Sequence, residues 1–134
     1  MKKLLAGVAA GAVLSTMLMA LDEKELTKKM KAAGEHMGPI RKSAQAQSMP
    51  DVATHAKAMV QALEGTETFW KDRNLPQAVK WSEDGVVAAK ALAKAAEENN
   101  ADGVRAAMSK LGASCKSCHD VHREKLPDGT YKIK

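Results

Sequence analysis

The stretch VRAAMSKLGASCKSCHDVH, residues 104–122, decides the fold. Apolar side chains, the two cysteines of the chain and a histidine recur in it at intervals of four, three, four, three and four residues. This is the repeat of one face of an α-helix. The series comprises Val104, Met108, Leu111, Cys115, Cys118 and His122. We therefore predict a long helix over residues 101–125, with both thiols on the face that packs inward.

The cysteines belong to a CxxCH motif made by Cys115, Cys118 and His119. This is the spacing of c-type haem attachment. Two thiols three residues apart can each add to one haem vinyl group, and a histidine directly after the second thiol can bind the iron as fifth ligand. On a helix the three side chains share neighbouring parts of one face. The motif predicts one covalently attached haem c, with Cys115 and Cys118 as attachment points and His119 as axial ligand.

Other uses of the cysteine pair fit the chain less well. A dithiol redox motif opens a helix in a βαβ unit, and the sequence has no pattern of a parallel sheet. A zinc site needs four ligands, and the chain has only four histidines, His36, His55, His119 and His122. A disulfide between the two cysteines would close a very small loop and stabilise little.

The N-terminus has the pattern of a secretory signal peptide. Met1-Lys2-Lys3 is basic, residues 4–19 are apolar or small apart from Ser15 and Thr16, and charges begin at Asp22. We predict cleavage after Ala20, with an uncleaved anchor as the alternative. Covalent haem attachment in bacteria occurs outside the cytoplasmic membrane, so the two signals agree. Residues 21–134 are then one periplasmic haem domain with no stable membrane anchor.

Composition narrows the class of function further. The formal net charge is +5, and without Lys2 and Lys3 it is 5 − 2 = +3. No basic stripe is interleaved with stacking aromatic residues, so the sequence does not favour binding to nucleic acid. Aromatic residues are scarce, namely Phe69, Trp70, Trp81 and Tyr131. A core so poor in rings needs another large apolar filler, which a buried porphyrin would supply.

Four amphipathic segments with short connections predict an all-α, antiparallel four-helix bundle with the haem near the C-terminal helix. We place the helices over residues 22–47, 50–70, 76–98 (beginning at Pro76 or Ser82) and 101–125. Gly38-Pro39 should kink or interrupt the first helix. Residues 126–129 should end the last one, leaving 130–134 as a short surface tail.

These features together resemble the class II c-type cytochromes, the cytochrome c prime family, whose members carry CxxCH near the C-terminus. Residues 115–123 are similar to the family's C-terminal pattern, including an arginine four residues after the axial histidine, here Arg123. The family's pattern in the first helix is similar to Met30-Lys31-Ala32-Ala33-Gly34. Two positions depart from the pattern: His122 stands where an aromatic residue is usual, and Leu26 where a basic residue often stands.

The resemblance implies that Met30 faces the distal side of the haem and that Arg123 lies near the haem and the proximal imidazole. We predict Met30 as sixth ligand, with Met37, two turns along the same stripe, as second choice. A methionine ligand suits electron transfer. The sequence therefore predicts a monohaem cytochrome that carries single electrons between redox partner proteins and is not an enzyme. The alternative is a five-coordinate haem protein that binds nitric oxide or carbon monoxide.

The remaining polar candidates receive structural interpretations. We expect His36 to face solvent, His55 to be a core or boundary residue, and His122 to be a packing residue or a neighbour of the haem propionates. Trp70 and Trp81 are expected to pack in the core or at the haem edge. Bundles of this family often dimerise through their first two helices, so the resemblance also implies a homodimer as one possible assembly.

Overall fold

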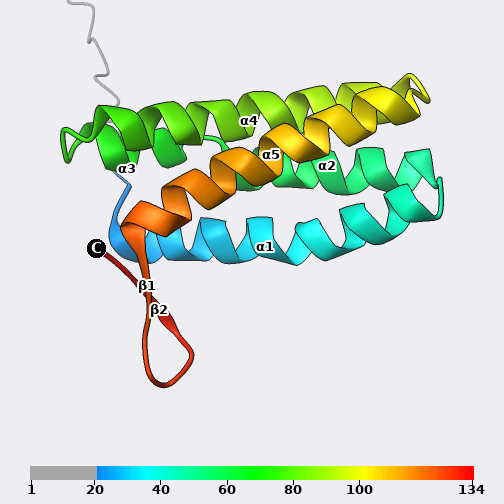
Figure 1. Ribbon diagram of the computed structural model, residues 1–134. Helices are drawn as coiled ribbons and strands as arrows, with labels where there is room; N and C mark the ends of the chain where they lie inside the picture. Colours follow the sequence, from blue (N-terminus) through cyan, green and yellow to red (C-terminus); the bar gives the residue numbers. More distant parts are fainter. Residues whose placement is uncertain (1–20) are drawn as a thin grey trace, which may run out of the picture.

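The structure is a computed structural model that describes residues 21–134. In this part of the chain the elements are α1 (Glu23–Gln45), α2 (Met49–Leu63), α3 (Thr66–Lys71), α4 (Pro76–Glu97), α5 (Ala101–His122), β1 (Arg123–Lys125) and β2 (Tyr131–Ile133). The four long helices form the predicted antiparallel bundle (Figure 1). The predicted signal peptide, residues 1–20, lies outside the described residues. Within residues 21–134 no helix is long and apolar enough to cross a membrane.

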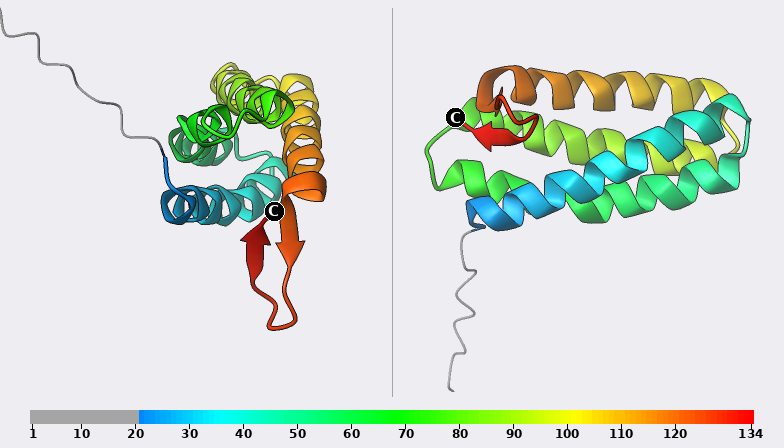
Figure 2. Two further views of the ribbon diagram at one scale, coloured as in Figure 1. Left: turned by 90° about the vertical axis from the view of Figure 1, so that its left-hand side faces the viewer. Right: turned by 90° about the horizontal axis from the view of Figure 1, so that it is seen from below.

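The bundle is closed on three of its four sides. α1 packs along α2, α2 along α4, and α4 along α5. Figure 2 shows the helices nearly end-on, with α1 and α5 at neighbouring corners. These two helices have no extensive contact of their own. The candidate site lies on this open side, because the inward faces of α1 and α5 do not pack against each other.

Small and apolar side chains hold the closed sides together. The main core includes the fully buried Ile40, Val52, Leu92 and Leu111, and alanines on α4 let its neighbours approach closely. A second, smaller cluster lies under the α3 end of the bundle. It consists of Leu26, Phe69, Trp70 and Ala78, and we refer to it as the aromatic cluster.

Side-chain caps fix the beginnings of two helices that carry the site. The Asp22 carboxylate accepts a hydrogen bond from the backbone N–H of Glu25 at 2.7 Å and so caps α1. The Asn100 side chain accepts one from the backbone N–H of Gly103 at 2.9 Å. These caps define the residues at which α1 and α5 begin.

Of the two outcomes predicted at Gly38-Pro39, a kink or an interruption, the interruption does not occur. α1 continues through Pro39 to Gln45. Proline removes one backbone hydrogen bond and crowds the preceding turn. The next residue, Ile40, is 0% exposed in the core against α2, and we attribute the continuity to this packing, which outweighs the local preference.

The predicted second helix is in fact two helices. Gly65 adopts φ +84°, a left-handed conformation that separates α2 from α3. Only glycine enters this region without a steric penalty. The buried Thr66 hydroxyl then donates to the Leu63 carbonyl at 2.7 Å and secures the corner. The change of direction brings Phe69 and Trp70 into the aromatic cluster.

The C-terminus differs most from the prediction. α5 ends at His122 rather than near residue 125, and Arg123 is extended, with φ −123° and ψ 130°. Residues 123–125 pair antiparallel with 131–133 to form a hairpin, where we expected a helix end and a tail. Pro127 and Gly129, the latter at φ +86°, favour the turn between the strands. Figure 1 shows the hairpin projecting beside the beginning of α1.

Candidate haem site

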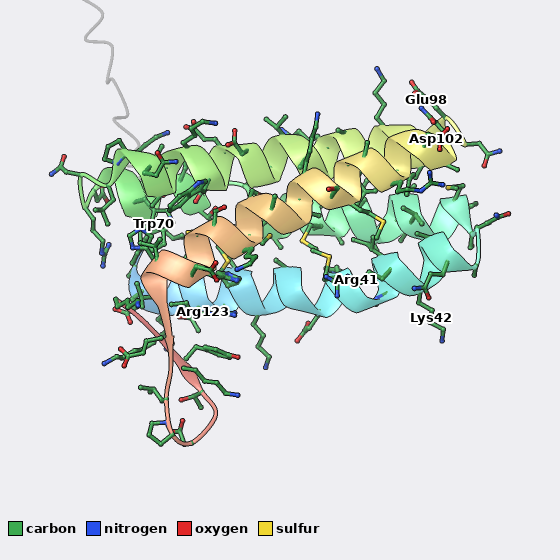
Figure 3. All side chains as sticks on the ribbon, in the orientation of Figure 1. Arg41, Lys42, Trp70, Glu98, Asp102 and Arg123 are labelled. Carbon is green, nitrogen blue, oxygen red and sulfur yellow. The ribbon has the colours of Figure 1, made fainter. Side chains whose placement is uncertain are left out.

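A cavity of about 630 Å³ occupies the open side of the bundle between α1 and α5. Its walls are mainly apolar and include three methionines, Met30, Met37 and Met59. Among the described residues, lysine and arginine side chains line it but no aspartate or glutamate does. Figure 3 shows side chains of α1 and α5 directed toward one another across this region.

The CxxCH motif faces this cavity. Cys115, Cys118 and His119 lie on α5, are half-buried and all line the cavity. The helix is oriented by the buried Leu111 and Ser114 beside them, with the Ser114 hydroxyl donating to the Leu111 carbonyl at 3.0 Å. The helical spacing thus brings the two thiols and the imidazole to one wall.

Burial sets the protonation of these groups. It raises the pKa of the Cys115 thiol, and burial followed by the neighbouring Cys115 raises the pKa of Cys118 to about 11. Burial lowers the pKa of His119, and the positive charge of Arg123 lowers it further. At neutral pH the thiols are therefore protonated and the imidazole is neutral, which is the form that binds a metal ion.

Met30 and Arg123 reach the same cavity from other elements. Met30 lies half-buried on α1, and it packs against both the main core and the aromatic cluster. Met37 lines the cavity two turns further along the helix. Arg123, the first residue of β1, is exposed, with its guanidinium carbon 4.1 Å from the centre of the Tyr131 ring. Its positive charge lowers the pKa of His119.

Trp70 contributes a feature that its sequence position did not reveal. It is 3% exposed, lines the cavity, and its Nε1–H has no hydrogen-bond partner. A buried N–H without an acceptor costs free energy, so it marks a place where a ligand acceptor would bind. His122 packs on the Trp70 ring at 4.8 Å between centroids, in agreement with its predicted packing role.

The other two histidines form a pair away from the cavity. His36 was expected to face solvent, but it is half-buried, and its Nδ1 lies 3.1 Å from Nδ1 of His55 on α2. The ring centroids are 5.4 Å apart, which is about the sum of this distance and the two ring radii, so the nitrogens point at one another. One N–H donates to the other ring, and the pair ties α1 to α2.

The residues present fit a covalently attached haem. The cavity is large and apolar, the thiols and the neutral imidazole stand on one wall, and a methionine thioether stands on α1. The unpartnered Trp70 N–H and the cations at the wall suit the carboxylates that a haem carries. A porphyrin between α1 and α5 would supply the interface that these helices lack.

Comparison with known proteins gives the same result. The family model described as Cytochrome C' matches residues 22–123. A cytochrome c' from Pararhodospirillum photometricum is 31% identical over 113 residues, covering 71% of this chain and 90% of the relative.

Three solved structures share the fold. Cytochrome c' from Thermochromatium tepidum has a TM-score of 0.64 and 21% identity, over 84% of this chain and 96% of its own. A cytochrome c' described for ligand-controlled dimer dissociation has a TM-score of 0.61 and 21% identity, over 84% and 96%. A nitric oxide complex of a cytochrome c prime variant from Alcaligenes xylosoxidans has a TM-score of 0.61 and 19% identity, over 83% and 92%.

The fold and the motif define a c-type haem protein of the four-helix class. With the family match over most of its length, the chain belongs to the cytochrome c' family. Its cofactor is therefore a covalently attached haem c, as the CxxCH motif predicts.

Proposed function

We propose that this protein is a periplasmic electron carrier whose single haem is attached through Cys115 and Cys118, with His119 and Met30 as the iron ligands. The observation that carries the proposal is that His119 on α5 and Met30 on α1 line one apolar cavity between two helices. Met37 lines the cavity as well and is the second choice for the sixth ligand.

The chain's own groups suit this role. Haem bound here supplies one-electron chemistry between ferric and ferrous iron. Burial keeps the His119 imidazole neutral, so that a ring nitrogen is free to coordinate. A thioether at Met30 would stabilise the ferrous state and raise the potential. Apolar walls exclude water, and Trp70 and Arg123 offer an N–H donor and a positive charge to the haem carboxylates.

The proposal also includes the localisation, the partners and the assembly of the protein. Residues 1–20 are proposed as the signal peptide that delivers the chain to the periplasm, where it would exchange electrons with redox partner proteins. Under this proposal the protein is an electron carrier rather than an enzyme. A homodimer is supported by the structural relative described for dimer dissociation.

A second candidate is a five-coordinate haem protein that binds nitric oxide or carbon monoxide. The structural relative solved as a nitric oxide complex favours it. In this case Met30 would only pack in the cavity. The two candidates differ in the spin state of the iron, which depends on whether a sixth ligand is bound.

The absorption spectrum of the holoprotein separates the two candidates. With Met30 bound, we expect low-spin iron in both oxidation states, a methionine–iron charge-transfer band at the red edge and slow binding of carbon monoxide. Met30→Ala should then give high-spin iron, rapid binding of carbon monoxide and a lower potential. Met37→Ala is the matched control and should leave the spin state unchanged. High-spin iron in the unmodified protein, with immediate binding of carbon monoxide, would establish the second candidate instead.

A further inference from the structure

The C-terminal hairpin forms part of the cavity although most of it lies beyond the family match. The match ends at residue 123, whereas residues 130–133 all line the cavity. They share that cavity with Cys118 and His119. Figure 1 shows the hairpin leaving the end of α5 and returning toward the beginning of α1. A segment outside the matched region thus supplies a wall of the haem site.

Few contacts hold this wall in place. Three residue pairs join β1 to β2, and the Lys134 N–H donates to the His122 carbonyl at 3.0 Å. Arg123 stacks over the Tyr131 ring. Ile133 packs against the aromatic cluster, which Cys118 and Met30 also contact. Ile133 is therefore the apolar side chain of the two strands that packs against the surroundings of the haem.

The remaining residues of the two strands contribute little burial. Residues 123–125, 131 and 132 are exposed, and Ile133 alone is half-buried. A two-stranded hairpin of this size is marginally stable by itself. Segments with few buried apolar contacts open locally at a lower cost than global unfolding. The hairpin should therefore be able to move away from the cavity while the helices remain folded. The frequency of this opening should depend on the contact between Ile133 and the aromatic cluster.

We propose that the hairpin is a gate of the haem cavity, held closed by Ile133, and that its opening sets how fast small ligands and water enter the cavity and reach the iron. The closed hairpin would exclude bulky reagents from this end of the cavity. The role goes beyond the proposed electron transfer, because it applies whether Met30 is a ligand or only a packing residue.

The experiment compares Ile133→Ala with Lys125→Ala in holoprotein that also carries Met30→Ala. This background removes Met30 as a ligand and applies under both candidate functions, so failure of the gate is distinguishable from failure of ligation by Met30. Lys125 is the matched control, because it lies on the same hairpin but is exposed and does not line the cavity. The measurements are the rate constant for imidazole binding to ferric haem and the hydrogen exchange of the Lys134 amide.

For Ile133→Ala we expect both rates to rise by about tenfold, since more frequent opening exposes the amide and the cavity together. Ile133→Leu and Lys125→Ala should match the parent. A chain ending at Lys125 lacks β2 and should bind imidazole at least as fast as Ile133→Ala. Faster exchange with unchanged imidazole binding would overturn the proposal, as would equal effects of Ile133→Ala and Lys125→Ala. Unchanged imidazole binding in the shortened chain would overturn it as well.

Discussion

The unpartnered N–H of Trp70 gives a prediction whose size depends on the presence of haem. Trp70→Phe removes the indole nitrogen and keeps an aromatic ring in the aromatic cluster. In the haem-free chain the nitrogen is buried with no acceptor. In the holoprotein we expect a haem carboxylate to accept this N–H, because the indole lines the cavity and the cavity wall carries cations but, among the described residues, no carboxylate.

The two states should respond differently to the substitution. Loss of packing volume destabilises both to a similar extent, so it cancels in the difference between them. In the haem-free chain the substitution also removes an unsatisfied donor, which costs about 1–3 kcal/mol while it is buried. In the holoprotein it removes a hydrogen bond to a charged group, worth about 1.5–3 kcal/mol. The destabilisation by Trp70→Phe should therefore be about 2.5–6 kcal/mol larger in the holoprotein.

Urea unfolding monitored by far-ultraviolet circular dichroism measures both free energies. The haem stays attached to the unfolded holoprotein, and Cys115→Ala with Cys118→Ala supplies the haem-free chain. Trp81→Phe is the matched control. Trp81 lines the same cavity but is only half-buried, and its Nε1 is not a buried nitrogen without a hydrogen-bond partner. It should change the two free energies equally. Equal effects of Trp70→Phe in both states would refute the reasoning, since no group on the haem would then accept this N–H.

Three further predictions test other parts of the structure. His119→Ala should prevent assembly of normal holoprotein or leave high-spin iron, visible in the ferric spectrum; an unaltered spectrum would mean another proximal ligand. Gly65→Ala should destabilise the protein by about 1–2 kcal/mol in urea, because φ +84° disfavours any Cβ although no side chain crowds the site. A double-mutant cycle of His36→Ala and His55→Ala should give a coupling of about 1 kcal/mol, and additive effects would exclude a stabilising bond.

The sequence predicted those parts of the fold that depend on local signals. Apolar periodicity and end signals identified α4 and α5 to within a few residues, and Asp22 marked the beginning of α1. The helix is not interrupted at Pro39, because burial of the following isoleucine, a tertiary effect, outweighs a local preference. The hairpin was missed because its strands are short and mostly exposed, so they show no alternation of apolar and polar residues.

The same distinction applies to the site. Cys115, Cys118 and His119 were recognisable because five consecutive residues contain the whole motif. The unsatisfied N–H of Trp70 and the packing of Ile133 arise from contacts between segments far apart in the chain. The His36–His55 pair joins residues 19 apart on two different helices. The periodicity of one helix does not specify which residues of another helix its side chains will contact.

The open side of the bundle links the stability of the fold to the binding of haem. Side chains, many of them alanine, fill the three closed interfaces, whereas α1 and α5 have no extensive contact of their own. A porphyrin bound in that gap would be part of the hydrophobic core as well as the cofactor. Substitutions at cavity-lining positions such as Met30 should alter the spectrum and stability together. Substitutions at buried positions away from the cavity, such as Ala89 on α4, should lower stability and leave the spectrum unchanged.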